Sequence, residues 1–269
     1  VGKMSIPELR KRNYPEKILL GSLAGSGTLG LLIPPSIILI IYGVAVQESI
    51  AKLFIAGIIP GIMIALIFMS YVIIWSLINK KSMPKIIEEY SFFEKIKRSK
   101  QLLPVIILIL AVIGSIYTGI ATATEAASLG VVGALILSYF QKSLTLKTFK
   151  SSLLGATKTS CMIAFILAGS TFLSLAMGFT GLPRNLALWI QNMELSPYVL
   201  IFVLMIFYII LGMFLDGISA VVLTMAIIEP MIRQAGFDMI WFGIFLVIVV
   251  EMAQILSLIH ISEPTRPLY

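Results

Sequence analysis

Ser22 to Ile41 reads Ser-Leu-Ala-Gly-Ser-Gly-Thr-Leu-Gly-Leu-Leu-Ile-Pro-Pro-Ser-Ile-Ile-Leu-Ile-Ile. This apolar segment is long enough to cross a bilayer, yet glycine and proline recur inside it. An interior glycine costs a helix about 1 kcal/mol relative to alanine, and a proline costs about 3 kcal/mol. We therefore expect the backbone to unwind here, at the helix-breaking residues Gly25, Gly27, Gly30, Pro34 and Pro35.

An unwound backbone at membrane depth needs protein cover or a polar cavity, because hydrocarbon offers no hydrogen bonds. The freed carbonyls near Gly27 and Gly30, with the hydroxyls of Ser26 and Thr28, are oxygen ligands of the kind that hard cations use. Broken helices of this kind hold ions and substrates in secondary transporters. The alternative interpretation is a proline kink in an ordinary spanning helix, and this segment alone favours neither.

The composition is that of a polytopic membrane protein. The 269 residues are 59% hydrophobic and 12% charged, whereas soluble proteins are about 45–50% apolar and about 25% charged. Cys161 is the only cysteine, so we expect neither a disulfide framework nor a cysteine metal cluster. The chain begins at Val1 without a charged and apolar leader, and we interpret it as a fragment of a longer protein.

We predict an all-α fold with broken helices and a re-entrant hairpin. A polar loop and a short helix at 186–193 precede the hairpin, and a surface amphipathic helix is expected within 80–101. The predicted spans are 18–46 (broken), 60–78, 102–117, 124–140, 160–179, 197–229 (interrupted at Leu215-Asp216-Gly217) and 240–255. The predicted segments are 1–47 (hairpin end and broken helix), 48–101 (span and amphipathic helix), 102–196 (scaffold helices and interfacial helix), 197–255 (second hairpin and last span) and 256–269 (non-native tail).

The cations indicate the orientation of the spans. Sixteen of the 20 Lys and Arg residues lie in three loops, at 1–17, 80–101 and 141–158, which the positive-inside rule places in the cytoplasm. Basic and non-basic loops alternate consistently along the chain if Asp216-Gly217 is the tip of a hairpin that enters and leaves the membrane on the same side.

A weak internal repeat supports a paired arrangement. A shift of 223 residues aligns Pro7 with Pro230, Arg10 with Arg233 and Tyr14 with Phe237. Both copies run from a proline-containing helix end through a short turn into a long apolar helix. Like units in opposite orientation are the inverted-repeat pattern of transporters, with the binding site between them. Chance similarity between apolar helices is the alternative.

Several motifs resemble the large membrane subunit of tripartite ATP-independent periplasmic (TRAP) transporters. They are residues 25–36, Ile41-Tyr42-Gly43, residues 52–61 (Lys-Leu-Phe-Ile-Ala-Gly-Ile-Ile-Pro-Gly), Thr124-Glu125-Ala126-Ala127 and Gly212-Met213-Phe214-Leu215-Asp216. The resemblance implies an elevator-type, sodium-coupled importer of organic acids such as dicarboxylates or sialic acid, in the bacterial inner membrane. It implies no cofactor beyond the sodium ion, and two partners: a small membrane subunit and a periplasmic substrate-binding protein.

The chain departs from the family pattern in three places. The family has a longer first half, of which only the end of a first re-entrant hairpin, near residues 4–14, is expected here. It has proline where this chain has Ala123, and a Thr-Pro-Pro sequence whose prolines correspond to Ser257 and Leu258. From Leu256 onward, including the only histidine, His260, the sequence resembles translated adapter sequence, so we predict a foreign tail.

Two carboxylates inside apolar sequence are candidate ion ligands. An ionised carboxylate at the bilayer centre costs at least about 2.5 kcal/mol, so Asp216 is expected to face a cavity or a cation. With Gly217 and Ser219 it forms a predicted second ion site at the hairpin tip; the alternative is an N-cap of the next helix. Glu251 is expected to line a second helix break, and its alternative is a pairing with a neighbouring subunit. Glu125 is interpreted as a capping-box residue with Thr122.

Two other functions are weighed against the importer. An intramembrane aspartyl protease needs a second carboxylate at the depth of Asp216, and Asp238 and Glu251 are poorly placed for that role. A passive channel would conduct without sodium or a binding protein. The chain lacks the Gly-x4-Gly-Lys-Ser/Thr phosphate loop, so ATP use is not expected. Its basic charge serves topology rather than nucleic-acid binding.

Overall fold

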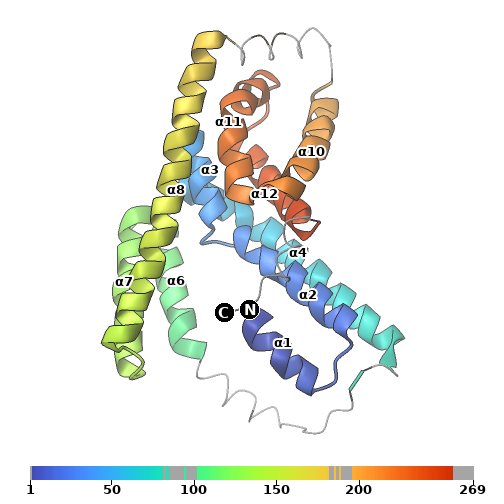
Figure 1. The fold of residues 1–269 in the computed structure, drawn as a ribbon, viewed down its shortest axis with the longest axis vertical. Coiled ribbons are helices and arrows are strands. Elements are labelled where there is room, and N and C mark those ends of the chain that lie inside the picture. Colours follow the sequence, from blue (N-terminus) through green and yellow to red (C-terminus); the bar gives the residue numbers. More distant parts are fainter. Residues whose placement is uncertain are drawn as a thin grey trace. The chain divides into compact units, whose positions relative to one another are not determined.

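The computed structural model describes residues 2–80, 83, 84, 94, 102–181, 185, 188 and 196–256. Within these ranges every regular element is a helix, which confirms the predicted all-α fold (Figure 1). The predicted surface helix within 80–101, most of the predicted helix at 186–193 and the predicted foreign tail after Leu256 lie outside the described residues.

The helices follow one another with few long connections. Five of them, α4, α7, α8, α10 and α11, are long and apolar enough to cross a membrane, so the chain is a multi-pass membrane protein. The elements are α1 (Gly2–Lys11), α2 (Glu16–Thr28), the 3-10 turn η1 (Leu29–Leu31), α3 (Ile37–Ala45), α4 (Ile50–Ile78), α6 (Leu103–Tyr117), α7 (Ala123–Phe140), α8 (Leu146–Thr180), α10 (Pro197–Phe214), α11 (Gly217–Gln234) and α12 (Met239–Ile255).

The chain divides into two compact units. The first comprises Val1–Met83 and Phe165–Tyr269, and α12 forms its centre, since it packs against α2, α3, α4, α10 and α11. Ten of the 17 residues of α12 are buried, so this apolar helix is covered mainly by protein. The broken segment and the hairpin α10–α11 both belong to this unit.

The second unit, Pro84–Ala164, contains the antiparallel pair α6 and α7. Thr122 caps α7: its hydroxyl oxygen accepts from the Glu125 amide at 3.3 Å, and its own amide donates to the Glu125 carboxylate at 2.8 Å. The predicted capping box is therefore confirmed. Gly133 allows close packing, because a Cβ there would lie 2.3 Å from Leu108 Cδ1.

Two helices are longer than the sequence predicted. Residues 146–158 of the interfacial segment join the fifth span in one 35-residue helix, α8, which the Thr145 hydroxyl caps by accepting from the Thr148 amide at 3.1 Å. Likewise α4 begins at Ile50, capped by Ser49, and continues through Pro60. The predicted elements end at charged residues, but cations do not stop a helix. A spanning helix also tolerates an internal proline when neighbouring groups satisfy the backbone carbonyls that the proline leaves unbonded.

Candidate ion site at a broken helix and a hairpin tip

The predicted helix break is present, but it lies further along the chain than the glycines. Helix α2 continues to Thr28, η1 follows, and α3 starts only at Ile37. Residues 32–36 are irregular and include Pro34 and Pro35. Proline both removes a backbone donor and pushes the preceding residue out of the helical region, whereas a glycine only weakens the helix. Gly25 and Gly27 therefore remain helical, which corrects the predicted unwinding at these residues.

Protein covers one side of this break. The Ser36 side chain is buried; its hydroxyl donates to the Leu31 carbonyl and accepts from the Leu39 amide at 3.2 Å, which caps α3. The Leu32 carbonyl oxygen lies 3.1 Å from the position that a Cβ on Gly57 would take. The irregular backbone is thus hydrogen-bonded to the helical turns on either side of it and packs against α4. Non-helical backbone at membrane depth requires such cover by protein.

The candidate ligands of the first helix lie at the end of α2. The hydroxyls of Ser26 and Thr28 donate to the carbonyls one turn earlier, Leu23 at 3.3 Å and Gly25 at 2.9 Å. Both oxygens retain lone pairs for a cation. Ser26, Gly27 and Gly30 are exposed and Thr28 is half-buried, so the described residues do not enclose these positions.

Asp216 lies in the turn between α10 and α11, at the tip of this helical hairpin, and caps α11. The Ser219 amide donates to Asp216 Oδ2 at 3.1 Å, and the Ser219 hydroxyl donates to Oδ1 at 2.5 Å. Asp216 therefore has the N-cap geometry of the alternative interpretation, and both of its carboxylate oxygens accept hydrogen bonds from Ser219. The two arms of the hairpin are joined by a hydrogen bond between the Tyr208 and Thr224 hydroxyls at 2.6 Å.

Gly217 brings the hairpin tip against two other helices. A Cβ on Gly217 would stand 2.6 Å from Gln254 Nε2, 2.8 Å from Val250 Cγ1 and 2.9 Å from Ile38 Cδ1. The tip therefore meets the last turns of α12 and the first turn of α3. Sequence reasoning missed Gln254, although a polar side chain one turn from Glu251 in an apolar helix was a usable signal.

Glu251 is a buried carboxylate in the core of the first unit. Its side chain is 4% exposed, and Oε1 has no hydrogen-bond partner among the described residues. It follows Ile244 by seven residues, or about two helical turns, so both share one face of α12. Ile244 Cδ1 lies 3.6 Å from the Cβ position of Gly57, which places this face toward α4.

The helix that carries Glu251 also packs against the broken segment, because α12 contacts α2 and η1 as well as α4. Gly217 contacts the neighbouring Val250 and Gln254 face instead. Burying an ionised carboxylate without a partner is costly, so Glu251 must be neutralised here either by a proton or by a bound cation. Among the candidate side chains, Glu251 has the clearest unmet need for a ligand.

The two proposed repeats share their turn geometry. Helices α1 and α11 end at Lys11 and Gln234, and α2 and α12 begin at Glu16 and Met239, a displacement of 223 residues in both cases. The turn residue in the left-handed region shows the same displacement: Asn13 has φ 56° and Gly236 has φ 81°. Helix α12 is continuous to Ile255, so a second break at 257 and 258 falls outside the described residues.

Comparison with known proteins identifies the family. The sequence profile described as "Tripartite ATP-independent periplasmic transporter, DctM component" matches residues 1–256. The chain is 30% identical over 257 residues to the C4-dicarboxylate TRAP transporter large permease protein DctM of Pseudomonas aeruginosa, covering 95% of this chain and 59% of that protein. It is 31% identical over 267 residues to the protein of the same name from Rhodobacter capsulatus, covering 94% and 60%.

A third relative is the sialic acid TRAP transporter permease protein SiaT of Haemophilus influenzae, 32% identical over 246 residues, covering 91% of this chain and 39% of that protein. The chain thus spans less than two thirds of the length of these relatives. Its helices, its broken segment and its hairpin all lie within the matched region. The chain belongs to the DctM component family of tripartite ATP-independent periplasmic (TRAP) transporters.

Proposed function

We propose that this chain is part of a sodium-coupled importer of organic acids in the bacterial inner membrane. It works with a small membrane subunit and receives its substrate from a periplasmic binding protein. Relatives named for C4-dicarboxylates and for sialic acid support an organic acid as substrate. A relative named isethionate TRAP transporter permease protein DctMQ supports a close association with a second membrane subunit.

The observation that supports sodium coupling is the buried Glu251 carboxylate, whose Oε1 has no partner among the described residues, on a helix that packs against the broken segment. A cation that binds here neutralises the carboxylate and removes the cost of burying it. The break supplies backbone carbonyls nearby, and the hairpin tip with Asp216, Gly217 and Ser219 forms a second candidate site. A cation bound at these helices would stabilise the same conformation that binds the substrate. Each ligand would then raise the affinity for the other, and this couples sodium to the substrate.

The family of the chain disfavours the protease alternative, because its relatives are named transporter permeases. Asp216 caps α11 and Asp238 caps the start of α12, where it accepts from the Trp241 amide at 2.8 Å. Glu251 lies 13 residues beyond Asp238, which is about 20 Å along a helix. Val250 and Gln254, on the same turn of α12 as Glu251, contact Gly217 at the hairpin tip, so Glu251 rather than Asp238 is the carboxylate nearer in depth to Asp216. A passive channel stays distinguishable by experiment, because its flux would need neither sodium nor a binding protein.

Asp216→Asn tests the second ion site separately from the cap. Asparagine caps a helix about as well as aspartate but carries no charge. We expect the sodium concentration for half-maximal uptake to rise about tenfold, because losing a charged ligand costs on the order of 1.5 kcal/mol. The measurement is sodium-dependent uptake by the intact transporter.

Asp216→Ala serves as the comparison for this test, because it removes both the charge and the cap. It is expected to shift sodium dependence similarly and to lower stability by about 1 kcal/mol. A sodium dependence unchanged in Asp216→Asn would reduce Asp216 to a capping residue.

A further inference from the structure

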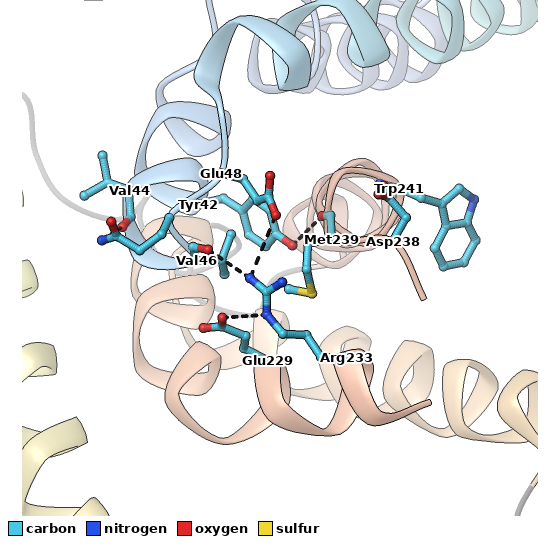
Figure 2. A network of polar contacts seen from close by, with 10 residues as sticks. Tyr42, Val44, Val46, Glu48, Glu229, Arg233, Asp238, Met239 and Trp241 are labelled. Atoms are coloured by element: carbon cyan, nitrogen blue, oxygen red, sulfur yellow. Dashed lines mark hydrogen bonds and ion pairs between the residues drawn. The ribbon is translucent and has the colours of Figure 1, made fainter. Parts of the chain in front are cut away.

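A polar cluster joins the far ends of α3 and α11, away from the hairpin tip (Figure 2). Its centre is Arg233, in the last turn of α11. Nε of Arg233 donates to Glu229 Oε1 at 2.9 Å, within the same helix. Nη2 donates to the Val46 carbonyl at 3.2 Å and lies 3.8 Å from Glu48 Oε1. One guanidinium thus links α11 to the turn between α3 and α4.

Tyr42 makes a second link beside the first. Its hydroxyl donates to the Met239 carbonyl at 2.6 Å, which ties α3 to the first residue of α12 (Figure 2). The Tyr42 side chain is fully buried, and its ring lies over Gly243. The turn between α11 and α12 is therefore held to the end of α3 at two points, 187 and 197 residues away in sequence.

These links act on the same helices that carry the candidate ion site. Helix α3 meets α11 at both of its ends: Ile38 lies against Gly217 at the hairpin tip, and Val46 accepts from Arg233 at the other end. A rigid helix held at one end keeps its other end in register. If α11 moves as one body, loosening at Arg233 would reach Gly217 and the cap formed by Asp216 at the other end of the helix.

We propose that Arg233 is a positioning residue that holds the hairpin tip against α3 and α12. The proposal rests on the proposed function, because the tip is there a sodium site. Arginine suits this role since its planar fork reaches acceptors on two elements at once, whereas lysine offers a single compact charge. Because the Arg233 side chain is 47% exposed, solvent screens its ion pairs with Glu229 and Glu48. The hydrogen bond to the Val46 carbonyl therefore contributes more to holding the two elements together.

Arg233→Gln tests the proposal by hydrogen exchange on the intact transporter. The amides of Gly236 and Phe237, which donate to carbonyls of α11, are expected to exchange about tenfold faster. The decisive readout is the tip, where the Ser219 and Ala220 amides donate to Asp216. Their exchange is also expected to accelerate, and the sodium concentration for half-maximal uptake is expected to rise. Arg233→Lys should restore part of each effect.

Arg10→Gln is the matched control. Arg10 occupies the corresponding helix end in the first repeat copy, but its partner is Glu16 at 2.6 Å, in a pair with both side chains more than half exposed. Exchange at 219, 220, 236 and 237 should not change in this variant.

Unchanged exchange at 236 and 237 in Arg233→Gln would refute the clamp, and a change there without one at 219 and 220 would refute the positioning role. Uptake by the parent transporter that does not depend on sodium would count against the proposed function instead. The hydrogen-exchange results would still decide the role of Arg233.

Discussion

Replacing Glu251 with glutamine is expected to abolish sodium-driven uptake by the intact transporter without unfolding it. Glutamine keeps the shape of the side chain and removes the charge that the proposed sodium site requires. A charged ligand to a buried cation contributes several kcal/mol, so uptake at limiting sodium should fall well beyond tenfold, the factor that corresponds to about 1.4 kcal/mol. The measurement is initial uptake rate against sodium concentration.

Stability should move in the opposite direction to activity in this variant. In the absence of sodium the parent protein buries a carboxylate whose Oε1 has no partner in the described part of the chain, and glutamine removes the cost of burying that charge. The unfolding temperature of Glu251→Gln without sodium is therefore expected to equal or exceed that of the parent. Glu16→Gln, at the exposed start of α2, is the matched control and should leave uptake unchanged. Glu251→Gln with the sodium dependence of the parent would remove Glu251 from the ion site.

Replacing Gly243 with alanine is expected to destabilise the first unit strongly. The new Cβ would lie 2.4 Å from Cε1 and 2.8 Å from Cδ1 of the Tyr42 ring. This ring cannot swing aside cheaply, because it is fully buried and its hydroxyl is bonded to Met239. Overpacking of this kind costs about 1–3 kcal/mol, and breaking the buried hydrogen bond adds a similar amount. The measurement is the thermal unfolding midpoint of the purified subunit.

Gly114→Ala is the control for this substitution. Gly114 lies inside α6, and a Cβ there would meet no described residue within 4 Å. Alanine is the better helix former by about 1 kcal/mol, so this variant should be neutral or more stable. Equal unfolding midpoints for Gly243→Ala and Gly114→Ala would contradict the close approach of α3 to α12.

Local chemistry predicted much of this fold from the sequence. Pro34-Pro35 indicated the break because a proline pair excludes a continuous helix whatever surrounds it. Leu215-Asp216-Gly217 indicated the hairpin tip because aspartate before a helix start is a favoured N-cap. The shift of 223 residues also relates the observed helix ends and turn residues, which depend on residues close together in sequence.

Tertiary packing decided what the sequence left open. Gly25 stays helical where its backbone packs against the Phe68 ring, a contact that no local pattern reveals. The α8 helix is continuous because a cationic stretch does not by itself end a helix. The contacts of Gln254 with the hairpin tip and of Arg233 with Val46 join residues far apart in the chain, so periodicity and motif spacing could not predict them.

Uptake by the reconstituted intact transporter tests sodium coupling most directly. Proteoliposomes would receive radiolabelled organic acid, with and without the periplasmic binding protein, under an inward sodium gradient or an equal potassium gradient. The account predicts accumulation above the external concentration only when the sodium gradient and the binding protein are both present. Accumulation that is equal under potassium, or equal without the binding protein, would contradict it.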